Sequence, residues 1–405
     1  MRSSRRSESR LGSTQLAVDV GLPVALLLAL AIVFGIERFG GKPVPQTPAL
    51  EIVEPGESPQ PQAPIRRLRI GVTPMKPEFD DMGKLLDSLG EGYRYQPFSL
   101  NDLQDLSKIL EFDVIFITCS GVPQSWLDER VGEGPREGTE VFTANEAVLE
   151  RVHECLKKYV RRGKTLYVSD LHFNLVAGAF PEFVDEAKAG KGKVQNLTAD
   201  VVDAGLKELL GAELPLKFDQ PGWRPAAFDE EKAAVFLRGT FTTTDGDTET
   251  APLLVRFPVG DGTVIFTSFH NEAQNNEMEL KLLRYLVFSA MTAEVDTRVN
   301  RMMVKGGFSP AKKGLFSASA AEPSVTKTYS CTKAADLQFV LGFQSQGARL
   351  KLAVTGPDGR AREKQGTSTL TIDVPNAAVG EWQYTVTALD LPNENFPFTV
   401  TVGEK

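Results

Sequence analysis

Three apolar runs of this sequence are each followed at once by side chains that can take part in catalysis or bind a ligand. The runs are FDVIFIT (112–118), TLYV (165–168) and TVIFTSF (263–269). Since ligands of open α/β sheets bind beyond the carboxyl ends of strands, residues placed there are candidates for a functional site. These side chains are Cys119 after the first run, Ser169, Asp170 and His172 after the second, and His270 and Glu272 after the third.

Two kinds of covalent chemistry can be built from these residues. Ser169 or Asp170 can act as a nucleophile if His270 serves as its base and Glu272 orients the imidazole ring. A thiol at Cys119 is the other candidate nucleophile, although free cysteines at strand ends are usually buried and inert. The simpler interpretation is that Ser169 and Asp170 cap the helix that follows them, and that His270 and Glu272 form a hydrogen-bonded pair.

A metal site is a further alternative. Asp170, His172, His270 and Glu272 are chemically suitable ligands for one ion. A ligand set drawn from separate loops is weak evidence, however, so we expect neither a bound metal nor a cofactor. We expect a binding site rather than a catalytic one, formed by Asp170, His172, His270, Glu272 and Cys119.

The elements around these residues alternate between strands and helices from residue 65 to residue 294. Asn145–Arg161 has the spacing of an amphipathic helix, and Gly163 ends it. Short strand–helix connections predict a three-layer α/β domain with a mainly parallel sheet. The interval from Gly190 to Thr250 is harder to interpret, and we expect added strands and irregular loops there.

Two stretches in this domain, RRGKTLYVSDLHFNLVAGAFPE (161–182) and GDGTVIFTSFHNEAQNN (260–276), resemble the class I glutamine amidotransferase-like fold in its degenerate, ThuA-like branch. The resemblance implies a nucleophile turn at 168–172 and matches His270 and Glu272 to the family's histidine and glutamate. The turn lacks the family's cysteine and its flanking glycines, which removes the usual thiol chemistry. A glutaminase is therefore not expected.

After residue 294 the alternation of strands and helices ends. Residues 295–323 are predicted to be a linker because of Gly306-Gly307 and Lys312-Lys313-Gly314. Residues 324–405 alternate apolar and polar side chains in several short runs, which predicts an all-β sandwich. DLQFVLGF (336–343), LKLAVTGPDG (350–359) and NAAVGEWQYTVTA (376–388) resemble the pre-peptidase C-terminal type of domain. The resemblance implies an adhesion or spacing module of the cell envelope.

The N-terminal part predicts a membrane anchor. The run VGLPVALLLALAIVFGI (20–36) supports a transmembrane helix over 16–39. Four arginines precede this run, which favours a cytoplasmic tail (1–15) and an exported body. Seven prolines within 41–64 predict an extended stalk over 40–64. A cleaved signal peptide is the main alternative, but no small-residue cleavage site follows the run.

Composition narrows the function further. The chain has 45 basic and 53 acidic residues and a net charge of −8, which argues against nucleic-acid binding. Its three cysteines cannot form a disulfide framework.

We therefore expect a single-pass bacterial envelope protein whose non-catalytic α/β domain binds a ligand or acts as a scaffold. The expected partner is a sugar-like small molecule or another membrane protein. A membrane-tethered hydrolase that uses Ser169 or Asp170 with His270 and Glu272 is the alternative.

Overall fold

The computed structural model describes residues 50–52, 68–133, 140–185, 190–274 and 276–405. The predicted tail (1–15) and transmembrane helix (16–39) lie outside these ranges. No helix within the ranges is long and apolar enough to cross a membrane. In the predicted stalk (40–64), the described residues form a short strand, β1 (Leu50–Ile52), which pairs in parallel with β17 (Ala361–Gly366).

The central element is a nine-stranded sheet in the order β3-β2-β4-β7-β12-β11-β10-β8-β9. Neighbours from β3 to β12 pair in parallel, whereas all the pairs from β12 to β9 are antiparallel. Its strands are β2 (Ile70–Thr73), β3 (Tyr95–Pro97), β4 (Val114–Ile117), β7 (Thr165–Ser169), β8 (Gln195–Val201), β9 (Glu213–Phe218), β10 (Ala234–Thr242), β11 (Thr248–Val259) and β12 (Gly262–Thr267).

The sheet is therefore mixed rather than mainly parallel as predicted. The physical reason is the length of the connections. Short turns join β10 to β11 and β11 to β12, and a turn of that length can only reverse the chain into an antiparallel neighbour. The strands expected between Gly190 and Thr250 are β8, β9, β10 and the start of β11, with the helix α5 (Ala204–Leu210) between β8 and β9.

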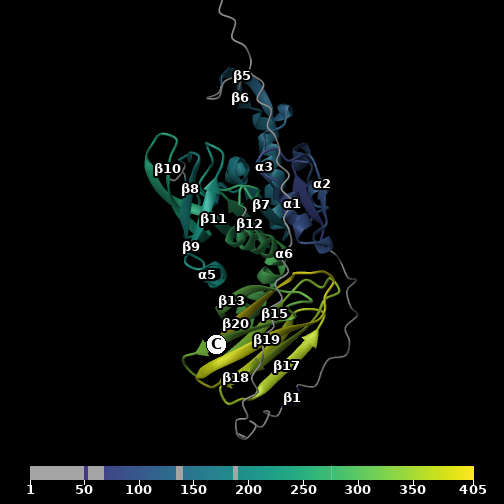
Figure 1. Cartoon of the computed structure of the whole chain (residues 1–405). Helices are drawn as coiled ribbons and strands as arrows, with labels where there is room; N and C mark the ends of the chain where they lie inside the picture. Colours follow the sequence, from purple (N-terminus) through teal and green to yellow (C-terminus); the bar gives the residue numbers. More distant parts are fainter. Residues whose placement is uncertain (1–49, 53–67, 134–139, 186–189, 275) are drawn as a thin grey trace, which may run out of the picture. The chain divides into compact units, whose positions relative to one another are not determined.

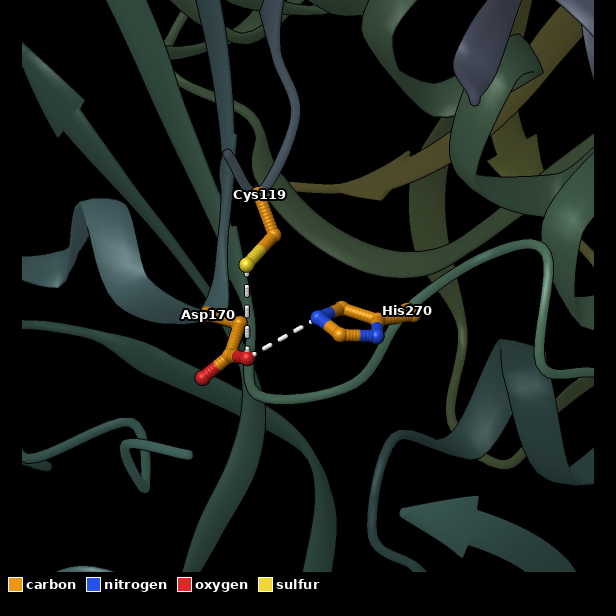
Figure 2. Close-up of side chains that lie close together, drawn as sticks. All are labelled: Cys119, Asp170 and His270. Carbon is orange, nitrogen blue, oxygen red and sulfur yellow. Dashed lines mark hydrogen bonds and ion pairs between the residues drawn. The ribbon is translucent and has the colours of Figure 1, made fainter. Parts of the chain in front are cut away.

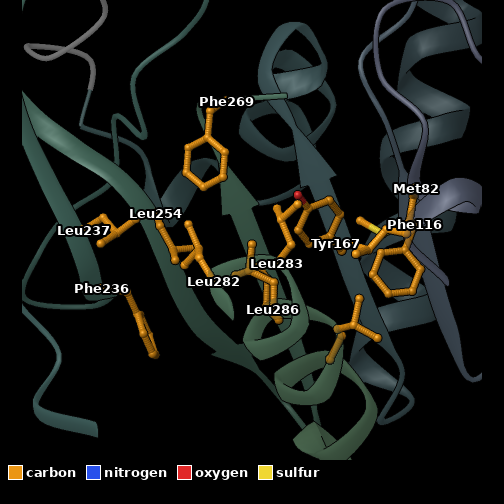
Figure 3. Packing of buried hydrophobic residues seen from close by; sticks show 14 of the residues in the cluster. Met82, Phe116, Tyr167, Phe236, Leu237, Leu254, Phe269, Leu282, Leu283 and Leu286 are labelled. Carbon is orange, nitrogen blue, oxygen red and sulfur yellow. The ribbon is translucent and has the colours of Figure 1, made fainter. Parts of the chain in front are cut away.

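Helices cover both faces of the sheet, as strand–helix alternation predicted (Figure 1). Val114 and Phe116 of β4 join a hydrophobic cluster with α1 (Met82–Ser88), α5 and α6 (Glu277–Lys305), part of which Figure 3 shows. Ile115 and Ile117 of the same strand join the cluster of α2 (Leu106–Ile109), α3 (Glu146–Arg161) and α4 (Phe173–Ala179). A separate hairpin consists of β5 (Leu127–Glu133) and β6 (Glu140–Ala144).

The interval 295–323, predicted as a linker, is instead the end of α6 and the strand β13 (Ser309–Ala318). Val295, Val299 and Met303 lie on one side of α6 and are buried against Val340. This helical spacing continues the helix past the predicted end of the domain. Gly306 caps α6 and Gly307 has a φ of +79°, so the two glycines mark a helix end rather than a flexible segment.

The C-terminal residues form two all-β sheets that share one hydrophobic cluster, as in a β-sandwich. One sheet has the order β1-β17-β16-β19-β14 and the other β13-β20-β15-β18. The rings of Phe339 and Tyr384 meet between them, with centroids 5.9 Å apart. The remaining strands are β14 (Ser324–Cys331), β15 (Ala335–Gly342), β16 (Arg349–Thr355), β18 (Leu370–Ala377), β19 (Gly380–Asp390) and β20 (Phe396–Glu404).

Candidate functional site

The three strands whose ends carry the candidate residues are neighbours in the sheet. β4, β7 and β12 lie side by side and run in parallel, so their carboxyl ends meet at one edge. Figure 2 shows Cys119, Asp170 and His270 converging there. The Cys119 Sγ lies 3.6 Å from Asp170 Oδ2, and His270 Nε2 lies 3.0 Å from the same oxygen. All three residues are at most 3% exposed, so this cluster is buried.

Asp170 occupies the turn between β7 and the helical segment that begins directly after it. Its φ of +45° lies in the left-handed region, which aspartate tolerates better than most residues. Such a strand-to-helix turn carries the nucleophile in many hydrolases, and this one forms without flanking glycines. Neither Ser169 nor Asp170 caps the helix through its side chain, contrary to the simpler interpretation. Asp170 Oδ1 instead accepts a hydrogen bond from the backbone N–H of Arg224, at 3.0 Å.

His270 is held between two carboxylates. Its Nδ1 lies 2.8 Å from Asp219 Oδ1, on the side opposite to Asp170. Burial disfavours a charged imidazole, but the adjoining Asp170 carboxylate, together with Cys119, outweighs this effect and raises the pKa of His270. Asp219 was not predicted. It directly follows the alternating run ELPLKF of β9, so its position after a strand was the available signal.

Glu272 does not orient His270 as the hydrolase hypothesis required. Its side chain is 46% exposed and forms an ion pair with Lys84. His172 also points elsewhere, because its Nε2 shares a 3.0 Å hydrogen bond with Ser120 Oγ. Burial lowers the pKa of His172 to about 4, which keeps this ring neutral. The metal set considered from the sequence is therefore not assembled: Asp170 and His270 meet, while Glu272 and His172 lie apart from them.

Ser169 belongs to a second polar cluster centred on Asp80. Its Oγ accepts a hydrogen bond from the Cys119 backbone N–H at 3.0 Å and donates to Asp80 Oδ2 at 3.3 Å. Asp80 also accepts hydrogen bonds from Asn271 Nδ2 and from the Glu272 backbone N–H, and burial raises its pKa to about 6. The Ser169 hydroxyl is thus hydrogen-bonded to Asp80 and to the Cys119 backbone rather than to the base His270.

The loop that carries His270 is fixed on both sides. Gln274 bridges it to β9, since its amide accepts from the Lys217 N–H and donates to the Lys217 and His270 carbonyls. On the other side, Tyr167 donates a 3.0 Å hydrogen bond to Asn271. Both partners of this loop are strand residues, so the position of His270 is set by the sheet.

Phe218 and Trp223 close the outer side of the site. A small pocket lined by Asp170, Asp219, His270 and these two rings has no space for a water-sized molecule. The rings stack with centroids 3.9 Å apart, and Trp223 Nε1 donates to the Lys193 carbonyl. Gly192 lies so close to Trp223 that a Cβ there would approach the indole ring to 1.9 Å.

Cys119 is a protonated thiol in these surroundings. Burial raises its pKa, and this effect outweighs the opposing influence of His270. The other two cysteines, Cys155 and Cys331, are also buried and unpaired by disulfides. The sequence analysis included Cys119 in the expected binding site and considered it as a nucleophile only as an alternative, because it follows an earlier strand than the nucleophile turn does.

Comparisons with known proteins give structural neighbours but no family. No family model matches the chain, and no curated protein matches it. Among solved structures, a cytoplasmic protein from Salmonella typhimurium is 13% identical over 54% of this chain and 98% of its own, with a TM-score of 0.32. A glutamine amidotransferase from Thermotoga maritima is 11% identical over 60% of this chain and 94% of its own, also with a TM-score of 0.32.

Proposed function

We propose that this chain is a membrane-anchored envelope protein whose α/β domain binds a ligand or a partner protein and does not catalyse a reaction. The supporting observation is the packing of the candidate site. Asp170 and His270 are buried beneath Phe218 and Trp223, and the pocket beside them has no room for a water-sized molecule. A catalytic site needs a space beside its nucleophile where the reacting atom can lie.

The finer assignments belong to this proposal. We infer a ThuA-like branch for the α/β domain and a pre-peptidase C-terminal type for the two β sheets, each from the sequence motifs described above. A sugar-like small molecule or a second membrane protein is the expected partner. The N-terminal run 20–36 supports anchoring by residues 16–39, with the body on the exported side.

Deleting residues 1–39 should convert the protein from a detergent-requiring form to one that is soluble in buffer. The physical reason is that the run 20–36 supplies the apolar surface that a bilayer solvates. Detergent phase separation of both forms measures this directly. A deletion of residues 1–15 is the matched control, because it keeps the run and should still partition into detergent. Partition of the full-length protein into the aqueous phase would contradict the anchor. A separate protease digestion of intact spheroplasts tests the orientation. Protection of residues 41–64 there would contradict export of the body.

A second candidate function is a hydrolase with Asp170 as its nucleophile. One observation favours it: Asp170 lies on a turn with positive φ, 3.0 Å from His270 Nε2, while Asp219 holds His270 Nδ1 at 2.8 Å. In this mechanism an Asp170 oxygen attacks an alkyl carbon and expels a halide to form an ester. The raised pKa of His270 keeps the ring protonated at neutral pH, so the ring must first lose this proton. It can then take a proton from water, and the resulting hydroxide attacks the Asp170 carbonyl carbon and releases the alcohol. Asp219 takes the orienting role that the sequence gave to Glu272.

Incubation with a chloroalkane-linked fluorophore should leave Asp170 unlabelled. We expect this result because the site is closed, and because ester formation needs the alkyl carbon in line with the carboxylate. Peptide mass spectrometry of the wild type and of His270→Gln measures it, since the variant would trap an ester that the wild type hydrolyses. Asp170→Asn is the control for labelling elsewhere. A stoichiometric adduct on Asp170 in the His270→Gln protein would reject the binding proposal and support the hydrolase.

A further inference from the structure

Cys119, Asp170 and His270 bring three different metal-ligating atoms to one point in the fold. Their ligand atoms all lie within 4.8 Å of one another. A zinc ion binds thiolate, imidazole and carboxylate at about 2.0–2.3 Å, so tetrahedral ligand atoms are separated by roughly 3.3–3.6 Å. The two measured edges, 3.6 Å from sulfur to oxygen and 3.0 Å from nitrogen to oxygen, are close to this size.

The surroundings of the three residues fix which atoms face that point. Asp219 lies at His270 Nδ1, which leaves Nε2 directed at the cluster. The Arg224 backbone N–H occupies Asp170 Oδ1, which leaves Oδ2. The Cys119 backbone is bound to Ser169. Histidine ligands of zinc commonly donate their second ring N–H to a carboxylate in this way, and such outer contacts tune metal affinity.

His270 Nε2 is the second and independent observation. Among the described residues it is a buried nitrogen without a hydrogen-bond partner, and its 3.0 Å contact with Asp170 is an ion pair. His270 is 3% exposed, so water does not satisfy this atom from the surface. A cation at the centre of the cluster would give Nε2 a partner.

We propose that Cys119, Asp170 and His270 bind one zinc ion. A thiolate in the ligand set favours zinc over magnesium or calcium. The ion's two positive charges balance the thiolate and the carboxylate, and Cys119 and His270 each release one proton to solvent on binding. This inference goes beyond the proposed function, since a binding module and an enzyme can each hold such an ion.

The test uses the full-length chain in detergent, stripped of metal and then given one equivalent of Zn²⁺ or Co²⁺. Elemental analysis should find one zinc per chain after dialysis. The Co²⁺ form should show the intense near-ultraviolet absorption of a thiolate–cobalt bond. Cys119→Ser should abolish that absorption, whereas Cys155→Ser, which removes another buried thiol, should preserve it. A wild-type protein that retains no zinc, or a cobalt form without the thiolate band, would overturn the proposal.

Two further variants keep the test independent of folding defects. Asp219→Asn removes only the carboxylate behind His270 and should weaken zinc affinity by about 10–100-fold. His153→Gln changes a half-buried histidine on α3 and should leave affinity unchanged. Circular dichroism establishes that each variant is folded. Equal zinc affinity in Asp219→Asn and in the wild type would contradict the proposed site. The zinc test and the chloroalkane test have independent outcomes. A wild-type protein that retains no zinc would overturn the zinc site, and labelling of Asp170 by the chloroalkane would overturn the binding proposal.

Discussion

Replacing Asp296 by asparagine should lower the free energy of unfolding by about 3 kcal/mol. Asp296 lies on α6 and is 2% exposed. Its Oδ2 is 3.1 Å from Arg256 on β11 and 2.6 Å from Lys313 on β13. Removing the negative charge leaves two cations without their buried counterion, which is the costly way to disrupt such a network. Removing one partner of a buried ion pair typically lowers the free energy of unfolding by about 3–5 kcal/mol. We expect the lower end of this range because the Lys313 side chain is 34% exposed.

Urea unfolding of the wild type and Asp296→Asn measures this difference. Glu294→Gln is the matched control, because Glu294 lies on the same helix but is exposed. It should change stability by less than about 0.5 kcal/mol. A loss below about 1 kcal/mol in Asp296→Asn would show that the network contributes little.

The same pair of proteins tests a pH dependence. Burial raises the pKa of Asp296, but the charges of Lys313 and Arg256 outweigh it and hold the pKa below its ordinary value of 3.8. A carboxyl with a depressed folded pKa contributes stability that is present above the unfolded pKa and lost as pH falls through the folded one. The stability difference should therefore be complete at pH 6 and shrink below about pH 4. A difference that stays constant would contradict this assignment.

Replacing Trp223 by alanine should cost about 3–5 kcal/mol and open the site beside His270. The indole is 1% exposed and packs against Phe218 and Phe241, with ring centroids 3.9 and 4.6 Å away. Truncation removes both contacts and the hydrogen bond to Lys193. Because Trp223 and Phe218 close the pocket that borders Asp170 and His270, their separation should admit solvent there.

Two measurements separate the stability effect from the opening. Urea unfolding gives the free-energy change, and the rate at which a thiol reagent reacts with Cys119 reports access in a background of Cys155→Ser and Cys331→Ser. Trp126→Ala is the matched control, since Trp126 is also 1% exposed but belongs to the cluster of α2, α3 and α4. Its stability loss should be similar, without faster labelling of Cys119. Equal labelling rates in the two tryptophan variants would show that Trp223 does not close the site.

The sequence predicted the edge of the sheet where the site lies, because local patterns determine it. The run 112–118 is apolar except for Asp113 and Thr118, and the structure shows Val114–Ile117 as a strand buried on both faces. The amphipathic spacing of Asn145–Arg161 predicted α3 (Glu146–Arg161), of which Asn145 is the N-cap. The antiparallel half of the sheet was not predicted as such. Its pairing depends on which strands become neighbours, and alternation within one strand does not carry that information.

The site was predicted only in part because side-chain direction depends on tertiary contacts. Asp170 and His270 meet as expected, but Glu272 turns away to Lys84 although it is two residues from His270. Asp219 takes its place from β9, which is distant in the sequence. The prediction of a linker over 295–323 was wrong for a related reason. It was based on glycines, whereas the apolar spacing that includes Val299 continues the buried face of α6.

One consequence of the strand order concerns self-association. β9 ends the nine-stranded sheet among the described strands, and its backbone is paired with β8 on one side. Exposed edge strands invite pairing with the same strand of another molecule, which leads to aggregation. The outward positions of β9 are Glu213, Pro215 and Lys217, all exposed. Two opposite charges and a proline without an N–H make this edge a poor template for such pairing, so the strand that precedes Asp219 is also protected against aggregation.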